Sequence, residues 1–577
     1  MGGLIFRRSL TKRVEYRTDE SKLNRRGTVS RRSRYASQLW FRALLVCALF
    51  AARITASKLA NINDCDEVYN YWEPLHFLLH GSGMQTWEYS PVYALRSYAY
   101  LMPFGFLAGL CRRLGIPLCK SKVGEFLFLR LANALACGVA EIGLALSIDR
   151  DFGNLSPGNL YLLFSAVSAG MFYSSPSLLP SSFAMTQIIC AYSCWLLKKD
   201  LLVILFFTNA ALLGWPFTGL LAIPLMFRML ARRRFARLLL YGGLVSGTLS
   251  FFVYLIDSYF YGRPVIAPLR LVLYNVFPSE GRGPDVFGRE PWFYYLINGN
   301  LNFPVFFALA LCYGLYLVGS ACAGLLGFSR AIPVRKSTRN GPELVFATSM
   351  LIWLVVLSCQ PHKEERFLYP IYPIVCLLAA ECCYRCARLL GDASVLRGFL
   401  VTFCVVSSVI FNLSRIAAQQ HYYSAPIAIF EQFVKRKCTL PMCTLCMGRE
   451  WHRFPSSFFL PNRTTLRFIP YADSGLLPRP FESTSSIPKG MNDMNIAVYD
   501  DRYVTDVARE CDFFIDVVDH PSAMPMPLKT WSMVADAHFL DRDSARSLHR
   551  IFYIPGISAK LPRHRYILLE RSYLRES

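Results

Sequence analysis

Charged residues are scarce in this sequence, and acidic residues are the scarcer kind. Only 18% of the 577 residues are charged, against about 25% in an ordinary soluble domain. The 39 Asp and Glu are outnumbered by 62 Lys and Arg, which leaves a net charge of +23, and 54% of the residues are hydrophobic. A mean hydropathy of +0.31 disfavours disorder, which needs low hydropathy, and nucleic-acid binding, which needs basic residues on a polar surface. The sequence therefore predicts a polytopic α-helical membrane protein without a nucleic-acid partner.

Long apolar runs are what this sequence has in place of charge. Eleven runs are long enough to cross a bilayer. They lie near residues 39–56, 93–111, 125–147, 158–174, 180–197, 201–229, 238–256, 303–327, 343–359, 367–388 and 398–413. We expect a basic cytosolic tail over 1–38, a membrane domain of about 11 transmembrane helices over 39–413, and a C-terminal lumenal domain over 414–577.

Basic clusters between the runs predict the orientation, because Lys and Arg collect in cytosolic loops. With a cytosolic N-terminus, four clusters are expected in the cytosol: those within 112–122, 232–237, 330–339 and 385–397. The pair Lys198-Lys199 is the exception, since the count places it on the lumenal side. An odd number of spans makes the C-terminal tail lumenal. Strand-like runs there predict mixed α/β structure: Arg467-Phe468-Ile469 and Phe513-Phe514-Ile515.

Cysteine is plentiful, at 19 residues, but most of it lies in apolar runs, where a thiol behaves as a small hydrophobic group. In the lumenal tail we expect one or two disulfides, with the pairing open, among four thiols: Cys438, Cys443, Cys446 and Cys511. Cys443-x-x-Cys446 lacks a second pair at zinc-finger spacing, so no metal site is expected there.

The first lumenal loop, expected over residues 58–92, carries three carboxylates within four residues, at Asp64, Asp66 and Glu67. Crowded like charges raise the cost of ionising every group, which can lift one pKa toward the range of a general base. Trp87 and Glu88 follow, and flat rings beside carboxylates suit a sugar. Two alternatives stay open: the acids only mark the lumenal side or cap a helix, and the aromatic residues only anchor the interface.

A second constellation follows the ninth run, in the segment Gln360-Pro-His-Lys-Glu-Glu-Arg-Phe367. Charged groups between apolar runs are costly unless they pair or bind an anionic ligand. The candidates for binding a phosphate are its cations, His362, Lys363 and Arg366. The candidates for orienting the arginine are its acids, Glu364 or Glu365. Arg96 is a further cation that either contacts a phosphate or pairs with an acid. An acid beside a phosphate cradle indicates group transfer from a lipid phosphate to a hydroxyl acceptor.

Five phrases carry a family resemblance. They are Asp64-Cys-Asp-Glu-Val-Tyr-Asn-Tyr-Trp-Glu-Pro74, Gln85-Thr-Trp-Glu-Tyr-Ser-Pro91, Ala94-Leu-Arg-Ser-Tyr98, His362-Lys-Glu-Glu-Arg-Phe367 and Gly448-Arg-Glu-Trp-His-Arg-Phe-Pro-Ser-Ser-Phe-Phe-Leu-Pro461. In these the chain resembles the dolichyl-phosphate-mannose-dependent mannosyltransferases of the endoplasmic reticulum, glycosyltransferase family 22. The resemblance is strongest to the α-1,2 branch, which adds the seventh and ninth mannoses of the lipid-linked N-glycan precursor. The α-1,6 and GPI-anchor mannosyltransferases share the His-Lys-Glu block and stay open as alternatives.

The resemblance implies a GT-C fold with a catalytic first lumenal loop and a lumenal tail domain. It implies dolichyl-phosphate-mannose as donor, a dolichyl-pyrophosphate-linked oligosaccharide as acceptor, and residence in the membrane lipid of the endoplasmic reticulum. It also implies a single inverting displacement with one base and no covalent intermediate. Because the leaving phosphate is already a good anion, no metal and no cofactor are expected.

The resemblance also suggests roles for single residues. The expected base is Asp66, with Glu67 as alternative or orienting group and Asp64 third. The expected ligands of the donor phosphate are His362, Lys363, Arg366 and Arg96. The expected acceptor-binding residues are Trp87, Glu88, Glu450, Trp451, His452 and Arg453. A transporter or flippase is the rival from another class, but the charged phrases lie at span ends and no internal repeat is visible.

Overall fold

The computed structural model describes residues 37–572 except 153–155, 232–234, 327–340, 390–394, 437, 439, 471–474, 519–529, 542 and 546. The expected basic tail up to residue 36 and the basic cluster of 330–339 lie outside the described residues.

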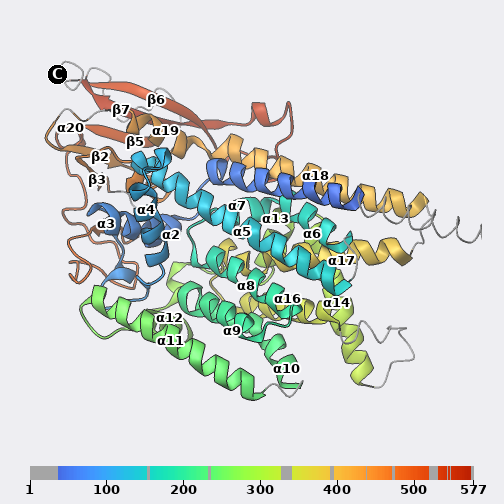
Figure 1. Ribbon diagram of the computed structural model, residues 1–577. Helices are drawn as coiled ribbons and strands as arrows, with labels where there is room; N and C mark the ends of the chain where they lie inside the picture. Colours follow the sequence, from blue (N-terminus) through green and yellow to red (C-terminus); the bar gives the residue numbers. More distant parts are fainter. Residues whose placement is uncertain are drawn as a thin grey trace, which may run out of the picture.

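The described residues form a bundle of apolar helices with a β-sheet at one end (Figure 1). Seven of the described helices are long and apolar enough to cross a membrane. They are Ser37–Leu59, α5 (Lys122–Phe152), α11 (Phe235–Tyr261), α14 (Phe306–Leu325), α16 (Pro342–Cys359), the segment Glu365–Leu389 that ends in α17 (Tyr372–Leu389), and α18 (Val395–Tyr423). The protein is thus a polytopic helical membrane protein, as predicted, while the count of eleven spans stays a prediction.

Other predicted spans are shorter or interrupted. The helix α8 (Pro180–Leu196) has 17 residues, and the run 158–174 divides into α6 (Ser156–Val167) and α7 (Ala169–Ser174). The run 201–229 begins with α9 (Asp200–Asn209) and ends with α10 (Ile223–Ala231). The chain between α9 and α10 is extended at Trp215, because the following Pro216 disfavours helical backbone at the residue before it.

The prediction that 93–111 spans the membrane is wrong. Helix α4 covers only Met102–Arg113, and the chain before it consists of turns. Arg112 Nε lies 2.9 Å from Glu125 Oε1, and His80 Nε2 lies 2.8 Å from Glu125 Oε2. Since His80 belongs to the segment that follows the first helix, the basic cluster of 112–122 lies at the same end of the bundle as the acidic loop, not at the opposite end.

The placement of Lys198-Lys199 is also corrected. The neighbouring Asp200 pairs with Arg237 at 3.6 Å, so the lysine pair lies at the same end of the bundle as Arg237. The segment 201–229 was predicted as a single span. It runs toward the end of the bundle that holds the acidic loop as far as Trp215 and then returns. The return is shown by Arg228, whose Nη1 donates to Gly341 O at 3.0 Å at the other end. The two miscounted segments change the number of crossings by one in opposite directions, so the total of eleven stays a prediction.

A five-stranded sheet forms the core of the C-terminal part. Its strands are β2 (Cys443–Met447), β3 (Thr464–Phe468), β5 (Phe513–Val518), β6 (Trp531–Leu540) and β7 (Arg563–Arg571), in the order β3-β2-β5-β7-β6. β2 is parallel to β3 and β5, and β7 is antiparallel to β5 and β6. The predicted strand run at 513–515 is confirmed, and the run at 467–469 is confirmed up to Phe468, where β3 ends. Every residue of β5 is buried, as in a strand covered on both faces.

Helix α18 continues past the predicted span end at 413 because its last turns pack on the C-terminal part. Ser414 Oγ donates to Tyr553 O at 2.9 Å, and Arg415 Nη1 donates to Ile551 O at 3.1 Å. The short helix α19 (Ala425–Val434) then contacts β6 and β7. In Figure 1, α18 runs beside the N-terminal helix, and Asn61 Nδ2 joins their ends by donating to Gln419 O at 2.9 Å.

Two disulfides join the four thiols named above. Cys438 is bonded to Cys443, and Cys446 to Cys511, so the two members of the Cys-x-x-Cys pair have different partners. A third disulfide, between Cys111 and Cys119, was not predicted, because this segment was assigned to a span and a cytosolic loop.

Candidate active site

The acidic loop begins with a short helical segment. Asp64 caps α2 (Cys65–Glu67), accepting a hydrogen bond at Oδ1 from Asp66 N at 2.9 Å. A π-helical turn, Val68–Trp72, connects α2 to α3 (Glu73–His80). Successive side chains of a helix point in directions about 100° apart, so the neighbouring acids Asp66 and Glu67 face different surroundings.

Glu67 points into the protein core. It is 3% exposed, and its Oε1 accepts from Trp72 Nε1 at 3.1 Å and from Leu178 N at 2.9 Å. It does not line the cavity described below. The geometry therefore separates Glu67, the predicted alternative base, from the place where a substrate would bind, and gives it the task of holding the loop on the helix bundle.

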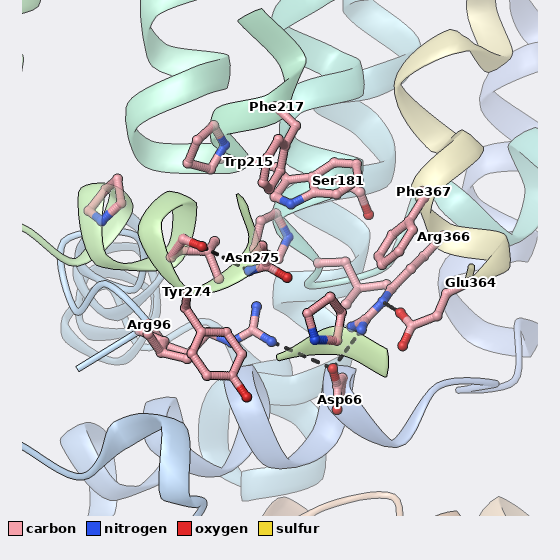
Figure 2. A pocket seen from close by; sticks show the side chains of 18 of the residues that line it. Asp66, Arg96, Ser181, Trp215, Phe217, Tyr274, Asn275, Glu364, Arg366 and Phe367 are labelled. Carbon is pink, nitrogen blue, oxygen red and sulfur yellow. Dashed lines mark hydrogen bonds and ion pairs between the residues drawn. The ribbon is translucent and has the colours of Figure 1, made fainter. Parts of the chain in front are cut away.

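Asp66 lines a cavity of about 580 Å³ between the acidic loop and the helix bundle (Figure 2). One wall is polar and is formed by side chains from the two predicted constellations: Asp66, Tyr71, Glu88, Arg96, His362, Glu364 and Arg366. The other wall is mainly apolar: Leu179, Leu212, Leu213, Trp215, Phe217, Leu220, Leu271, Val356, Leu357 and Phe367. The prediction that the loop and the segment 360–367 lie on the same side is confirmed by their direct contact.

The carboxylate of Asp66 lies between two arginines. Arg366 Nη2 donates to Asp66 Oδ2 at 2.5 Å, and Arg96 Nη2 lies 3.6 Å from the same oxygen. Figure 2 shows both guanidiniums directed at this carboxylate from two different directions. Arg366 is also held by Asp64 Oδ2, 3.0 Å from its Nε, and by an ion pair with Glu364. Of the two predicted orienting acids, Glu364 binds this arginine, whereas Glu365 Oε1 accepts from Asn302 Nδ2 at 3.0 Å.

Arg96 is held by Glu88 and by a tyrosine. Its Nε and Nη2 donate to the two oxygens of Glu88 at 3.0 and 2.8 Å, and its Nη1 donates to Tyr71 OH at 2.8 Å. This bidentate pairing fixes the plane of the guanidinium at the cavity wall. Arg96 thus pairs with acids in the structure, and Glu88, an expected acceptor ligand, makes its strongest contacts with Arg96.

Burial and charge shift the pKa values of the acids around Arg366. Burial raises the pKa of Asp64 to about 7, since it outweighs the attraction of Arg366, and Glu364 and Asp66 add repulsion. Burial also opposes the charge of Glu364, but Arg366 and His362 outweigh it and hold its pKa at about 2. Burial likewise disfavours the charged form of His362, yet its hydrogen bond with Glu364 raises its pKa above the ordinary value. Glu364 is therefore the permanent counter-charge in this group.

Lys363 does not line the cavity, in contrast to its expected contact with the donor phosphate. It is 5% exposed, and its Nζ donates to Glu290 O at 2.8 Å and to Gln360 O. His362 does line the cavity, with Nε2 3.0 Å from Glu364 Oε1 and Nδ1 3.1 Å from Gly288 O. Both side chains thus fasten the segment 277–293 to the charged block.

The expected acceptor residues fall into two groups. Trp87 and Glu88 line the cavity. The four expected from the tail, Glu450, Trp451, His452 and Arg453, do not. Trp451 O accepts from Tyr69 OH at 2.8 Å, and the Arg453 guanidinium lies 4.6 Å from the centre of the Phe539 ring. The tail phrase also contacts the acidic loop through Glu73, which accepts from Ser457 N at 2.5 Å and Ser457 Oγ at 2.7 Å.

Several cavity residues were not predicted. Tyr71 belongs to the acidic-loop phrase, and its spacing from Asp66 along the helical segment would have been a usable signal. Trp215 and Phe217 were hidden in the apolar run 201–229, where nothing in the sequence separates a cavity wall from a span that faces lipid, and Tyr274 lies in the stretch 257–302, to which no role was assigned.

A multi-pass helix bundle with this charged cavity at one end, capped by a mixed sheet, is the architecture of a membrane glycosyltransferase. A family model described as the Alg9-like mannosyltransferase family matches residues 44–461, more than half of the chain. The chain belongs to the Alg9-like mannosyltransferase family.

Curated relatives and solved structures agree with this membership. The α-1,2-mannosyltransferase ALG9 of Mus musculus is 38% identical over 539 residues, covering 88% of this chain and 85% of the mouse protein. The ALG9 of Saccharomyces cerevisiae is 33% identical, covering 89% of this chain and 92% of the yeast protein. The apo structure of ArnT from Cupriavidus metallidurans has the same fold, with a TM-score of 0.54, 14% identity, and coverage of 93% of this chain and 99% of ArnT.

Proposed function

We propose that this chain is the α-1,2-mannosyltransferase that adds the seventh and ninth mannoses to the lipid-linked N-glycan precursor in the endoplasmic reticulum. The donor is dolichyl-phosphate-mannose, and the acceptor is a dolichyl-pyrophosphate-linked oligosaccharide. One observation carries the proposal: in a mannosyltransferase chain, the carboxylate of Asp66 lies at the cavity wall between two arginines.

The donor would bind with its phosphate at the arginines and its lipid along the apolar wall. Arg366 and Arg96 present guanidinium groups, which bind phosphate oxygens in a bidentate manner. Leu213 and Phe217, from the segment that interrupts the bundle, continue the cavity as apolar surface away from the arginines. A lipid phosphate has the same division into a charged head and an apolar chain.

Asp66 would act as the base that takes the proton from the 2-hydroxyl of the acceptor. In the structure its Oδ2 is occupied by Arg366. A donor phosphate would compete for the same guanidinium groups and so release the carboxylate. Base strength would then depend on donor binding, since a carboxylate freed from a cation is a better proton acceptor. The hydroxyl attacks the anomeric carbon, the bond to the phosphate breaks, and the arginines hold the developing charge.

The reaction would need no metal ion. Among the described residues, one group has ligand atoms close enough to hold a metal, Asp64, Cys65 and Asp66. Arg366 is paired with both carboxylates, and burial raises the pKa of the Cys65 thiol well above 9, which keeps it neutral. A guanidinium already supplies the positive charge that a metal would bring, so we expect a chelator to leave transfer unchanged.

The orientation proposed from the basic clusters places the N-terminus in the cytosol, eleven crossings in the membrane, and the cavity and residues 414–577 in the lumen. The three disulfides all lie at the cavity end, and a lumenal side is oxidising.

The test is transfer by the purified protein. With dolichyl-phosphate-mannose and a lipid-linked six-mannose acceptor, we expect one added mannose, α-1,2-linked by linkage analysis of the product. An α-1,6 linkage, or transfer only to a GPI-anchor precursor, would replace this specificity by that of a related branch. Flux of an unmodified sugar lipid across sealed vesicles without any transfer would make the chain a transporter.

A further inference from the structure

A pair of arginines outside the cavity has no acidic partner. Arg263 follows α11, and Arg270 lies on the short helix α12 (Ala267–Val276). Arg263 Nη2 and Arg270 Nη1 both donate to Val92 O, at 3.1 and 3.3 Å, so the two guanidiniums lie side by side. Within the described part of the chain, neither forms an ion pair with a carboxylate. Burial and the charge of Arg270 lower the pKa of Arg263.

Some N–H donors of these two arginines remain available for a ligand. Arg263 Nε is shielded from solvent and has no hydrogen-bond partner among the described residues. An arginine carries five N–H donors in a planar fork, and the carbonyls of Val92 and Tyr93 use only part of the ten that the pair offers. Two like charges held together with unused donors indicate an anionic ligand that brings more than one negative charge.

The pair lies at the boundary between the cavity and the lipid-facing surface. Helix α12 turns Pro268 and Leu271 toward the cavity. It exposes Leu269 and Leu273 on its outer face, at 52% and 48%. Arg270 stands between these two faces. In Figure 1, α11 and α12 form the edge of the bundle opposite α18.

The arginine pair is also connected to the cavity through one aromatic contact. Tyr93, whose carbonyl oxygen accepts from Arg270, packs its ring 5.1 Å from that of Trp87, which lines the cavity. Asp493, an acid close to Tyr93, is already used, because it pairs with Arg282 at 3.3 Å.

We propose that Arg263 and Arg270 bind the diphosphate of the lipid-linked acceptor at the membrane surface, while its glycan reaches past Trp87 into the cavity. The inference rests on the proposed function, which gives the acceptor a lipid diphosphate. Several sugars separate that diphosphate from the reacting mannose, so the diphosphate stays apart from Asp66 when the end of the glycan reaches it. The donor phosphate is assigned to Arg96 and Arg366, and the outer pair therefore supplies a separate site at the level of the membrane surface.

The test compares two acceptors in the purified full-length protein. One carries the oligosaccharide on a lipid diphosphate, and the other carries the same oligosaccharide on a neutral alkyl chain. For Arg263→Gln/Arg270→Gln we expect the KM of the diphosphate acceptor to rise about 100-fold, since each lost charge-assisted contact is worth about tenfold. The KM of the neutral acceptor should stay close to that of the wild type. Arg509→Gln, which changes an arginine 86% exposed in the C-terminal part, is the matched control.

A second measurement does not depend on transfer. Farnesyl diphosphate should bind the wild-type protein and Arg509→Gln more tightly than it binds the double variant. An equal rise in KM for both acceptors, or no rise for either, would overturn the inference. The proteins are also compared in nanodiscs of different phosphatidylglycerol content. A KM change that depends on this content and not on the acceptor would overturn the inference as well, because the pair would then bind bulk lipid headgroups. A wild-type protein that transfers no mannose would contradict the proposed function, whereas the farnesyl diphosphate comparison would still decide this inference.

Discussion

The neighbouring carboxylates Asp66 and Glu67 should respond in opposite ways to loss of their charge. Asp66→Asn keeps the size of the side chain and an oxygen that accepts from Arg366, but it cannot take a proton. General-base catalysis contributes about 10²- to 10⁴-fold, so we expect the transfer rate to fall by that factor, equivalent to about 3–5 kcal/mol of barrier. The fold should survive, because Arg366 keeps its ion pairs with Asp64 and Glu364.

Glu67→Gln should retain most of the activity. Both hydrogen bonds of Glu67, from Trp72 Nε1 and Leu178 N, end on Oε1, and the amide oxygen of glutamine can accept both. We expect a rate within about fivefold of wild type and a stability loss of about 1 kcal/mol.

The assay for this pair is the initial rate of mannose transfer at saturating donor, measured on monodisperse protein whose thermal unfolding is recorded alongside. The reasoning would be refuted by a folded Asp66→Asn enzyme with the wild-type rate. It would equally be refuted by a folded Glu67→Gln enzyme as inactive as Asp66→Asn, since the base would then be the buried acid.

Three further predictions concern the parts that hold the site together. Burial raises the pKa of Glu73 to about 7 from its ordinary 4.5, so the folded protein keeps a proton that the unfolded chain loses. The free energy of unfolding should therefore fall by up to about 3 kcal/mol as the pH rises from 4.5 to 7. The thermal unfolding of Glu73→Gln should depend less on pH across that window. Lys363→Met leaves the carbonyl of Glu290 without its donor and should speed proteolysis within 277–293, where unchanged cleavage would count against the fastening role. Cys446→Ser/Cys511→Ser opens a loop of about 65 residues and should destabilise the C-terminal part by about 4 kcal/mol in chemical denaturation, and wild-type stability in this variant would contradict that role.

The two errors in the predicted topology have the same physical origin. The run 93–111 is as apolar as a span, yet its first half forms turns against the cavity, and 201–229 reads as one span although Trp215 interrupts it. Hydropathy records how much apolar surface a segment has, but not whether lipid or protein covers it. A segment buried under a domain and a segment facing lipid therefore look alike.

The charged phrases were informative because charge near a membrane is costly and is kept where it pairs or binds. They predicted that the acidic loop and the segment 360–367 lie on the same side, and the contact between Arg366 and Asp66 is the outcome. The phrases did not show which residue within each phrase lines the cavity and which is buried in the protein. Asp66 and Glu67 are adjacent in sequence, as are His362 and Lys363, and only the direction of each side chain places one member of each pair at the cavity and the other in the protein.

By itself, the sequence determined the membrane class, the family and the two short phrases that meet at the site. The length of an apolar run and the position of a rare charged residue are local properties that can be read directly from the sequence. The tertiary structure decided which acid lies between the two arginines, which cations line the cavity, and which apolar residues form its wall. It also joined Arg263 and Arg270 to Val92, more than 170 positions away in the chain. Such contacts depend on how helices pack and where they break, and no local pattern of residues encodes either.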